Sequence, residues 1–154
     1  MNSFLKFSLV FLVITTSSLV WSSDRALTKS LQAINKCVAA YQELNNGKNI
    51  DDHDNVYVHA GKNITGVMFT KGNVGSFEPR SEDYNLVMSC GVNISNDYEI
   101  YYLGSPMSDP LIDVSNEGID SDLYKDCIIE IQYQNENGNY KMKNIGILDI
   151  DKLN

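Results

Sequence analysis

A single stretch of the chain carries its apolar residues at helical spacing, and this constrains the fold more than any other feature of the sequence. These apolar residues recur every three or four positions: Leu27, Leu31, Ile34, Val38 and Tyr41. Such spacing places them on one side of an α-helix, and Asn46-Gly47 supplies a stop signal. The apolar side of a lone helix has to be covered, so the rest of the chain must provide a surface that fits it.

The later apolar stretches alternate with polar residues, which is typical of β-strands. Strand candidates follow one another in three pairs, each joined by a short turn: 56–60 with 64–70, 86–94 with 98–103, and 127–134 with 140–150. Asn137-Gly138 is the clearest turn signal, because both residues tolerate positive φ angles. We therefore predict an α+β fold in which an N-terminal amphipathic helix packs on an antiparallel sheet of about six strands, built from three hairpins.

An apolar leader, residues 1–22, precedes this fold. One positive charge, Lys6, stands before an apolar run, and Val20-Trp21-Ser22 offers the small residue expected at a cleavage site. This order of regions is typical of a secretory signal peptide, although residues 4–21 are also nearly long enough for a membrane anchor. In both cases we expect residues 23–154 to form a single exported domain, either periplasmic or extracellular.

The chain is acidic, with a formal net charge of −8. Such a surface repels the phosphates of nucleic acids and the headgroups of anionic lipids. We therefore expect no nucleic-acid partner, and contact with a membrane only through residues 4–21 if the leader is not cleaved. The charge favours association with a basic protein, but acidity also has the simpler effect of keeping a protein soluble.

Three cysteines, Cys37, Cys90 and Cys127, lie beyond the leader, and an oxidising compartment favours pairing of two of them. Cys90 and Cys127 each fall on the apolar side of an expected strand, within 86–94 and 127–134. We therefore predict a Cys90–Cys127 disulfide. Cys37 would then be a buried thiol, or alternatively the attachment point of a covalent partner.

Two segments are candidates for a partner-binding surface. The connection 109–126 is strongly acidic and contains Asp109, Asp113, Glu117, Asp120 and Asp122. An EF-hand starting at Asp113 fails, because Tyr124 stands where the bidentate Glu belongs; a weak, irregular calcium site and a plain solvated loop are the alternatives. Tyrosine is favoured at interfaces, and Tyr98, Tyr101 and Tyr102 must populate both faces of one short strand. The alternative is that the domain itself covers both faces.

Two hydrolase motifs, H-E-x-x-H and G-x-S-x-G, are absent from the sequence, and S-x-x-K occurs only as Ser3-Phe4-Leu5-Lys6 within the leader. Asp51-Asp52-His53-Asp54 and His59 gather potential ligands, but they lie around a polar loop, whereas zinc sites prefer His and Cys on rigid elements. We expect no catalytic residue, no metal and no cofactor. A small exported hydrolase that uses the 51–59 Asp/His cluster is an alternative.

Another alternative comes from the N-terminal layout, an apolar segment with an amphipathic continuation and then a predicted sheet with a disulfide. Lys6-Phe7-Ser8-Leu9-Val10 and the helix end from Ala39-Ala40-Tyr41 to Asn46-Gly47 carry the comparison. The layout resembles that of type IV pilin-like proteins, and it implies a structural subunit that retains its apolar N-terminal helix. Two departures are that no Gly precedes Phe7 and that Phe11 stands where the family has Glu.

The absence of catalytic motifs, the acidity and the small disulfide-bonded domain together favour a non-enzymatic function. Our leading hypothesis is an exported protein that binds a protein partner, as an inhibitor, an immunity-type protein or an envelope-assembly accessory. The candidate surfaces are the acidic connection 109–126 and the tyrosine-rich strand 98–102.

Overall fold

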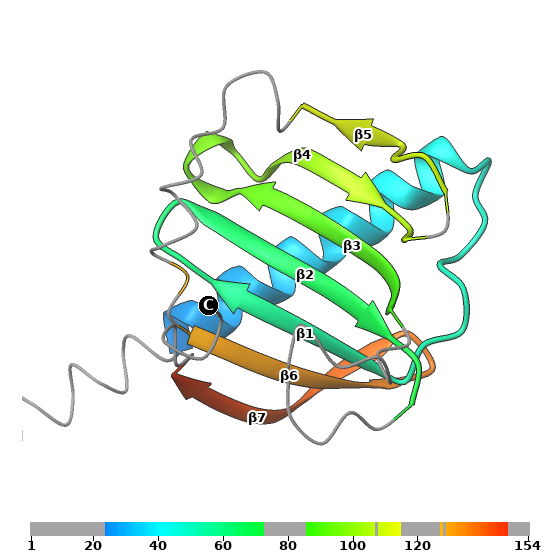
Figure 1. Cartoon of the computed structure of the whole chain (residues 1–154). Coiled ribbons are helices and arrows are strands. Elements are labelled where there is room, and N and C mark those ends of the chain that lie inside the picture. The colour runs from blue at the N-terminus through cyan, green and yellow to red at the C-terminus, as the bar shows by residue number, and fades with distance from the viewer. Residues whose placement is uncertain (1–23, 73–85, 107, 115–126, 128, 148–154) are drawn as a thin grey trace, which may run out of the picture.

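The described part of the protein folds as one helix on one face of a seven-stranded antiparallel sheet (Figure 1). The computed structural model describes residues 24–72, 86–106, 108–114, 127 and 129–147. The helix spans residues 24–44 and lies diagonally across the sheet. The predicted α+β fold is therefore confirmed, with seven strands rather than about six. The additional strand has only two residues and lies in a segment that we expected to be a loop.

The strands, in chain order, are β1 (Asn55–Ala60), β2 (Ile64–Thr70), β3 (Leu86–Asn93), β4 (Glu99–Gly104), β5 (Ile112–Asp113), β6 (Ile129–Glu136) and β7 (Asn139–Ile147). A short 3-10 helix, η1 (Ile94–Asn96), connects β3 to β4. The order across the sheet is β5-β4-β3-β2-β1-β6-β7, and all neighbours are antiparallel. All three predicted hairpins form, as β1–β2, β3–β4 and β6–β7. The third hairpin joins the sheet beside β1, so β6 lies next to a strand far from it in sequence.

Residues with positive φ angles form the β6–β7 turn and the end of the helix. Asn137 (φ 56°) and Gly138 (φ 87°) have the geometry expected of a type I′ hairpin turn, and the Asn135 side chain accepts a hydrogen bond from the Gly138 N–H at 2.8 Å. Asn46 (φ 55°) and Gly47 (φ 80°) end the helix, and the Gly47 N–H donates to the Gln42 carbonyl at 2.8 Å. Both local signals in the sequence therefore specify the structure at these two points.

The core lies between the helix and the sheet. One residue from each of five neighbouring strands is almost completely buried there, in a line formed by Ile131, Val58, Val67, Cys90 and Leu103. The helix contributes Ala33, Ile34 and Cys37 to the same cluster. Leu31 belongs to the predicted stripe but keeps 36% of its surface exposed, so the helix is rotated slightly from the orientation that its largest side chains suggest.

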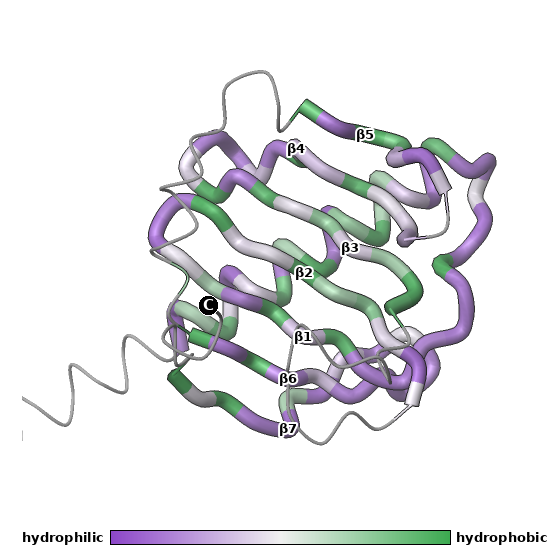
Figure 2. Tube along the Cα trace, viewed as in Figure 1, coloured by the Kyte–Doolittle hydropathy of each residue, from purple (hydrophilic) through white to green (hydrophobic). Residues whose placement is uncertain are grey.

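Hydropathy follows the same layers (Figure 2). Apolar and polar residues alternate along the strands, as a sheet with a buried face requires, whereas the connection 45–54 is almost wholly hydrophilic. Ile50 is the exception in that connection, and its side chain is buried in the core cluster. Within the described residues, no helix combines the length and apolar character needed to span a membrane. The apolar leader, residues 1–22, lies outside the described part of the chain.

The disulfide joins Cys37 in the helix to Cys90 in β3, with a Cα–Cα distance of 6.1 Å, so the predicted Cys90–Cys127 pair is wrong. The order of the strands explains the error. Residues in β3 and β6 are separated by β2 and β1, which corresponds to roughly 14 Å at the usual spacing of about 4.8 Å, well beyond the reach of a disulfide.

Cys127 also does not share the core-facing side of β6, because that strand begins only at Ile129. Its side chain remains a thiol, is buried, and donates a hydrogen bond to the Ile64 carbonyl at 3.4 Å. The prediction that Cys37 is the buried thiol is therefore wrong: Cys37 is the disulfide partner of Cys90, and the buried thiol is Cys127.

Candidate binding site

A row of paired residues crosses the face of the sheet opposite the helix. The register aligns Glu130, His59, Gly66, Gly91, Tyr102 and Asp113 on six neighbouring strands. Each residue of this row from β6 to β4 directly precedes or follows a core residue in its strand, so these positions face away from the helix. Residues far apart in the sequence thus meet on one surface.

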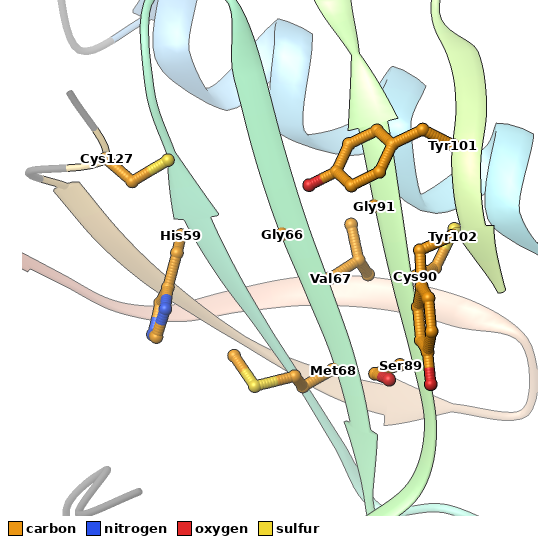
Figure 3. Close-up of a pocket in the computed structure, with 10 residues that line it drawn as sticks. All are labelled: His59, Gly66, Val67, Met68, Ser89, Cys90, Gly91, Tyr101, Tyr102 and Cys127. Atoms are coloured by element: carbon orange, nitrogen blue, oxygen red, sulfur yellow. The ribbon is translucent and has the colours of Figure 1, made fainter. Parts of the chain in front are cut away.

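Two glycines form a depression in the middle of this row. Gly66 and Gly91 are direct partners on β2 and β3, so no side chain rises from the sheet at either position. The two sites differ in what lies above them. A Cβ atom at Gly91 would come within 2.3 Å of Cζ of Tyr101, whereas at Gly66 the one described atom within 4 Å would be Cβ of His59, at 4.0 Å. The ring of Tyr101 therefore fills the space above one glycine and leaves the other open (Figure 3).

A β-bulge directs two consecutive tyrosines to this face. Gly91 pairs with Tyr102 and Val92 pairs with Ile100, so Tyr101 is the extra residue of β4. An extra residue interrupts the strict alternation of side chains and re-aims one of them. Tyr101 is therefore buried over the sheet, with 2% of its surface exposed, while Tyr102 is partly exposed beside it.

The depression widens into a pocket of about 350 Å³. The residues that line it come from β1 to β4 and from the start of the β6 region: His59, Gly66, Val67, Met68, Ser89, Cys90, Gly91, Tyr101, Tyr102 and Cys127. Figure 3 shows the ring of Tyr101 extending across the sheet toward Gly66, with His59 on the opposite side. The rim residues His59, Met68, Ser89 and Tyr102 are partly exposed, so the pocket has an accessible edge.

His59 is hydrogen-bonded to Glu130 at the edge of the pocket. Its Nε2 donates to a carboxylate oxygen of Glu130 at 3.0 Å, and both side chains are partly buried. The charge of Glu130 extends along this face, because it adds to burial in raising the pKa of Tyr57, two residues before His59. Among the described residues that line the pocket there is no Lys or Arg. The electrostatic character of this edge is therefore negative.

The three predicted tyrosines divide between the two faces. Tyr98 (φ 59°) lies on the helix side, where its hydroxyl donates to the side chain of Gln32. Only Tyr101 and Tyr102 border the pocket. Tyr98 precedes β4, so the three tyrosines do not share one strand, and the bulge turns both tyrosines of β4 to the pocket face instead of placing them on opposite faces.

The predicted acidic residues are only partly within the described structure. Asp109 is exposed after β4, and Asp113 is exposed in β5 directly opposite Tyr102. Glu117, Asp120 and Asp122 lie outside the described residues. The two surfaces proposed from the sequence, the acidic connection and the tyrosine strand, therefore meet at Asp113 and Tyr102.

The Asp/His cluster of residues 51–59 is not assembled into a site. His53 packs edge-on against Phe69, with ring centroids 5.1 Å apart. Its Nδ1 donates a hydrogen bond to the Asp51 carbonyl at 2.9 Å, and its Nε2 accepts one from the Tyr140 hydroxyl at 3.2 Å. Phe69 belongs to the core under the helix, whereas His59 faces the pocket on the other side of the sheet. Over the described ranges, no group of three or more His, Cys, Asp or Glu side chains is placed to hold a metal ion.

The geometry of the pocket is suited to binding. Cys127 and His59 both line it, but Figure 3 shows the His59 ring extending away from the Cys127 sulfur. A thiol and an imidazole that work together in catalysis need to come within hydrogen-bonding distance. The lining residues provide a glycine floor and two tyrosine rings, and the rim residue His59 is hydrogen-bonded to the carboxylate of Glu130 outside the lining.

The sequence contains one further signal for this site. A glycine inside a strand often marks the close approach of another group, and Gly66 and Gly91 each interrupt a predicted strand. Glu130 carries no such signal, because its proximity to His59 depends on the pairing of β1 with β6. Comparison with protein-family models, with curated proteins and with solved structures finds no match for the chain.

Proposed function

We propose that the protein is a non-enzymatic exported domain that binds a protein partner, and that the pocket opposite the helix is the centre of the contact. The observation that carries the proposal is the partly exposed Tyr102 beside a glycine-floored depression. Protein interfaces concentrate their binding energy in a few aromatic or charged anchors around a central pocket. The pocket offers such an arrangement on a rigid sheet.

Charge and compartment support the same proposal. The formal net charge of −8 favours a basic partner. The apolar leader and the Cys37–Cys90 disulfide are both compatible with an oxidising compartment outside the cytoplasm. An inhibitor, an immunity-type protein or an envelope-assembly accessory combines these properties.

The test compares two tyrosine variants in a quantitative capture of the partner from an envelope extract of the source cells. Tyr102→Ala removes the pocket rim and should weaken capture about 30-fold, the effect of losing an anchor worth about 2 kcal/mol. Tyr98→Ala is the matched control, because its ring lies on the helix side. Circular dichroism verifies that both variants are folded. Equal capture by the two variants, or capture of no protein by the wild type, would overturn the proposal.

N-terminal sequencing of the exported protein tests the role of the leader. A start near Ser23 supports a released binding domain, because it removes the apolar segment that the alternative requires. Retention of residues 4–21 would favour the structural, pilin-like subunit, in which an apolar helix continues into the helix of residues 24–44.

A further inference from the structure

We propose that the pocket receives a cationic side chain, lysine or arginine, from the partner protein. The inference rests on the proposed function for the identity of the partner as a protein. Three features support a cationic side chain independently of that proposal: the size of the pocket, its aromatic walls and the position of Glu130. Each of these features is on the face opposite the helix, where the cross-sheet row places His59, Gly66 and Tyr102 side by side.

The size of the pocket favours a single side chain. Small-molecule sites usually have volumes of roughly 300–1,000 Å³, and the pocket, at about 350 Å³, is at the lower end of this range. Among the described residues, the floor at Gly66 has room for a Cβ atom, which would meet only His59, at 4.0 Å. A long, unbranched side chain can lie along such a floor without displacing the sheet.

The walls fit a side chain with an apolar stem and a charged end. Met68 and the two tyrosine rings provide apolar surface for the methylene groups of lysine or arginine. The faces of tyrosine rings also attract cations through their quadrupole. Tyr101 is held firmly for this purpose, because its ring is buried against the Gly91 backbone.

Glu130 discriminates between cationic and apolar side chains. Its carboxylate is oriented by His59 and keeps 23% of its side-chain surface exposed, so it can accept a further hydrogen bond from a ligand. Glu130 does not itself line the pocket, and a long side chain reaches it past the rim residue His59. An apolar side chain that covered this carboxylate would take water from it without replacing the lost hydrogen bond, which is unfavourable. An acidic side chain would be repelled. An apolar pocket whose rim residue His59 is bonded to a carboxylate therefore favours a cation.

Peptide titration of the mature protein tests the inference. The probes are acetyl-Ala-Arg-Ala-amide, the same peptide with neutral citrulline in place of arginine, and the same peptide with apolar norleucine. Binding is followed by ¹H–¹⁵N chemical shifts at millimolar peptide concentrations. We expect the arginine peptide to shift the amide signals of Gly66, Gly91 and Tyr102, and to bind at least tenfold more tightly than either other peptide.

Two carboxylate variants identify the group that recognises the charge. Glu130→Gln preserves the shape of the side chain and should abolish the preference for arginine over citrulline. Glu136→Gln is the matched control, because Glu136 is an exposed residue of the same strand that pairs with Lys141 at 3.9 Å, outside the pocket. It should leave the preference unchanged, and thermal unfolding verifies that both variants are folded.

The inference is overturned by equal binding of the arginine and citrulline peptides, by tighter binding of norleucine, or by the absence of shifts in the pocket row. These results differ from a failure of the proposed function. If Tyr102→Ala still loses the partner while no cationic preference exists, the protein-binding proposal stands and only the choice of side chain is wrong.

Discussion

Replacement of Gly91 by alanine tests the packing that shapes the pocket. The new methyl group would lie 2.3 Å from Cζ, 2.5 Å from Cε2 and 2.6 Å from the hydroxyl oxygen of Tyr101. Atoms do not approach so closely, so the ring or the strand has to move. Tyr101 has 2% of its surface exposed and therefore little free space in which to rotate. We expect Gly91→Ala to destabilise the protein.

The expected magnitude follows from two opposing effects. Overpacking of a filled site typically costs about 1–3 kcal/mol. Alanine in a strand gains about 0.5–1 kcal/mol over glycine, because the unfolded chain loses less freedom on folding. Gly91→Ala should therefore lower the free energy of unfolding by about 1–2 kcal/mol. Gly66→Ala is the matched control on the neighbouring strand, where the nearest atom to the added Cβ is at 4.0 Å, and it should be neutral or slightly stabilising.

Urea unfolding followed by circular dichroism measures both variants and a double-mutant cycle with Tyr101→Ala. When the ring is absent, the added methyl group has nothing to meet, so the cost of Gly91→Ala should vanish in the Tyr101→Ala background. The coupling energy between the two positions should then be about 1–3 kcal/mol. The reasoning is refuted if Gly91→Ala is as stable as Gly66→Ala, or if its cost is the same with and without the Tyr101 ring.

Two further predictions concern the disulfide and a buried tyrosine. Reduction of the Cys37–Cys90 disulfide, whose cysteines are 53 residues apart, should lower the free energy of unfolding by about 4 kcal/mol in the chain-entropy model. Thiol titration of the unfolded, unreduced chain should find one thiol, which disappears in Cys127→Ala. A peptide linked through Cys90–Cys127 would contradict the assigned disulfide. Burial raises the pKa of Tyr133 to about 12, although a hydrogen bond with Ser30 lowers it in part. Because an unfolded tyrosine releases its proton from about pH 10, stability should fall as the pH rises from about 10 to 12. Tyr133→Phe should reduce this fall in urea midpoints, and an unchanged fall would refute the assignment.

The fold could be predicted because its signals are local. Helical spacing from Leu27 to Tyr41 indicated the helix, and the Asn137-Gly138 turn indicated the third hairpin. Strand β5 was missed because a two-residue strand has no periodicity to detect, and it forms only because β4 offers it a free edge at Leu103 and Tyr102.

The disulfide was assigned wrongly because pairing depends on the order of the strands, which local patterns do not contain. Alternation correctly placed Cys90 on the core side of its strand. It does not specify that β2 and β1 separate β3 from β6, or that the helix crosses the sheet with Cys37 above Cys90. Cys37 was in fact next to the apolar stripe, and the observed rotation of the helix brings it fully into the core.

The pocket depends on non-local pairing even more strongly. The His59–Glu130 bond joins residues 71 positions apart. It exists because the third hairpin docks beside β1. The tyrosine side of the pocket depends on a one-residue bulge, without which Tyr101 would point into the core and Gly91 would be as open as Gly66. A single irregularity therefore has two effects, since it makes one glycine necessary for packing and leaves the other available for a ligand. This separation is why the stability of Gly91→Ala and the ligand preference of Glu130→Gln can be tested independently: the first perturbs the wall that holds the pocket, and the second perturbs only the charge at its edge.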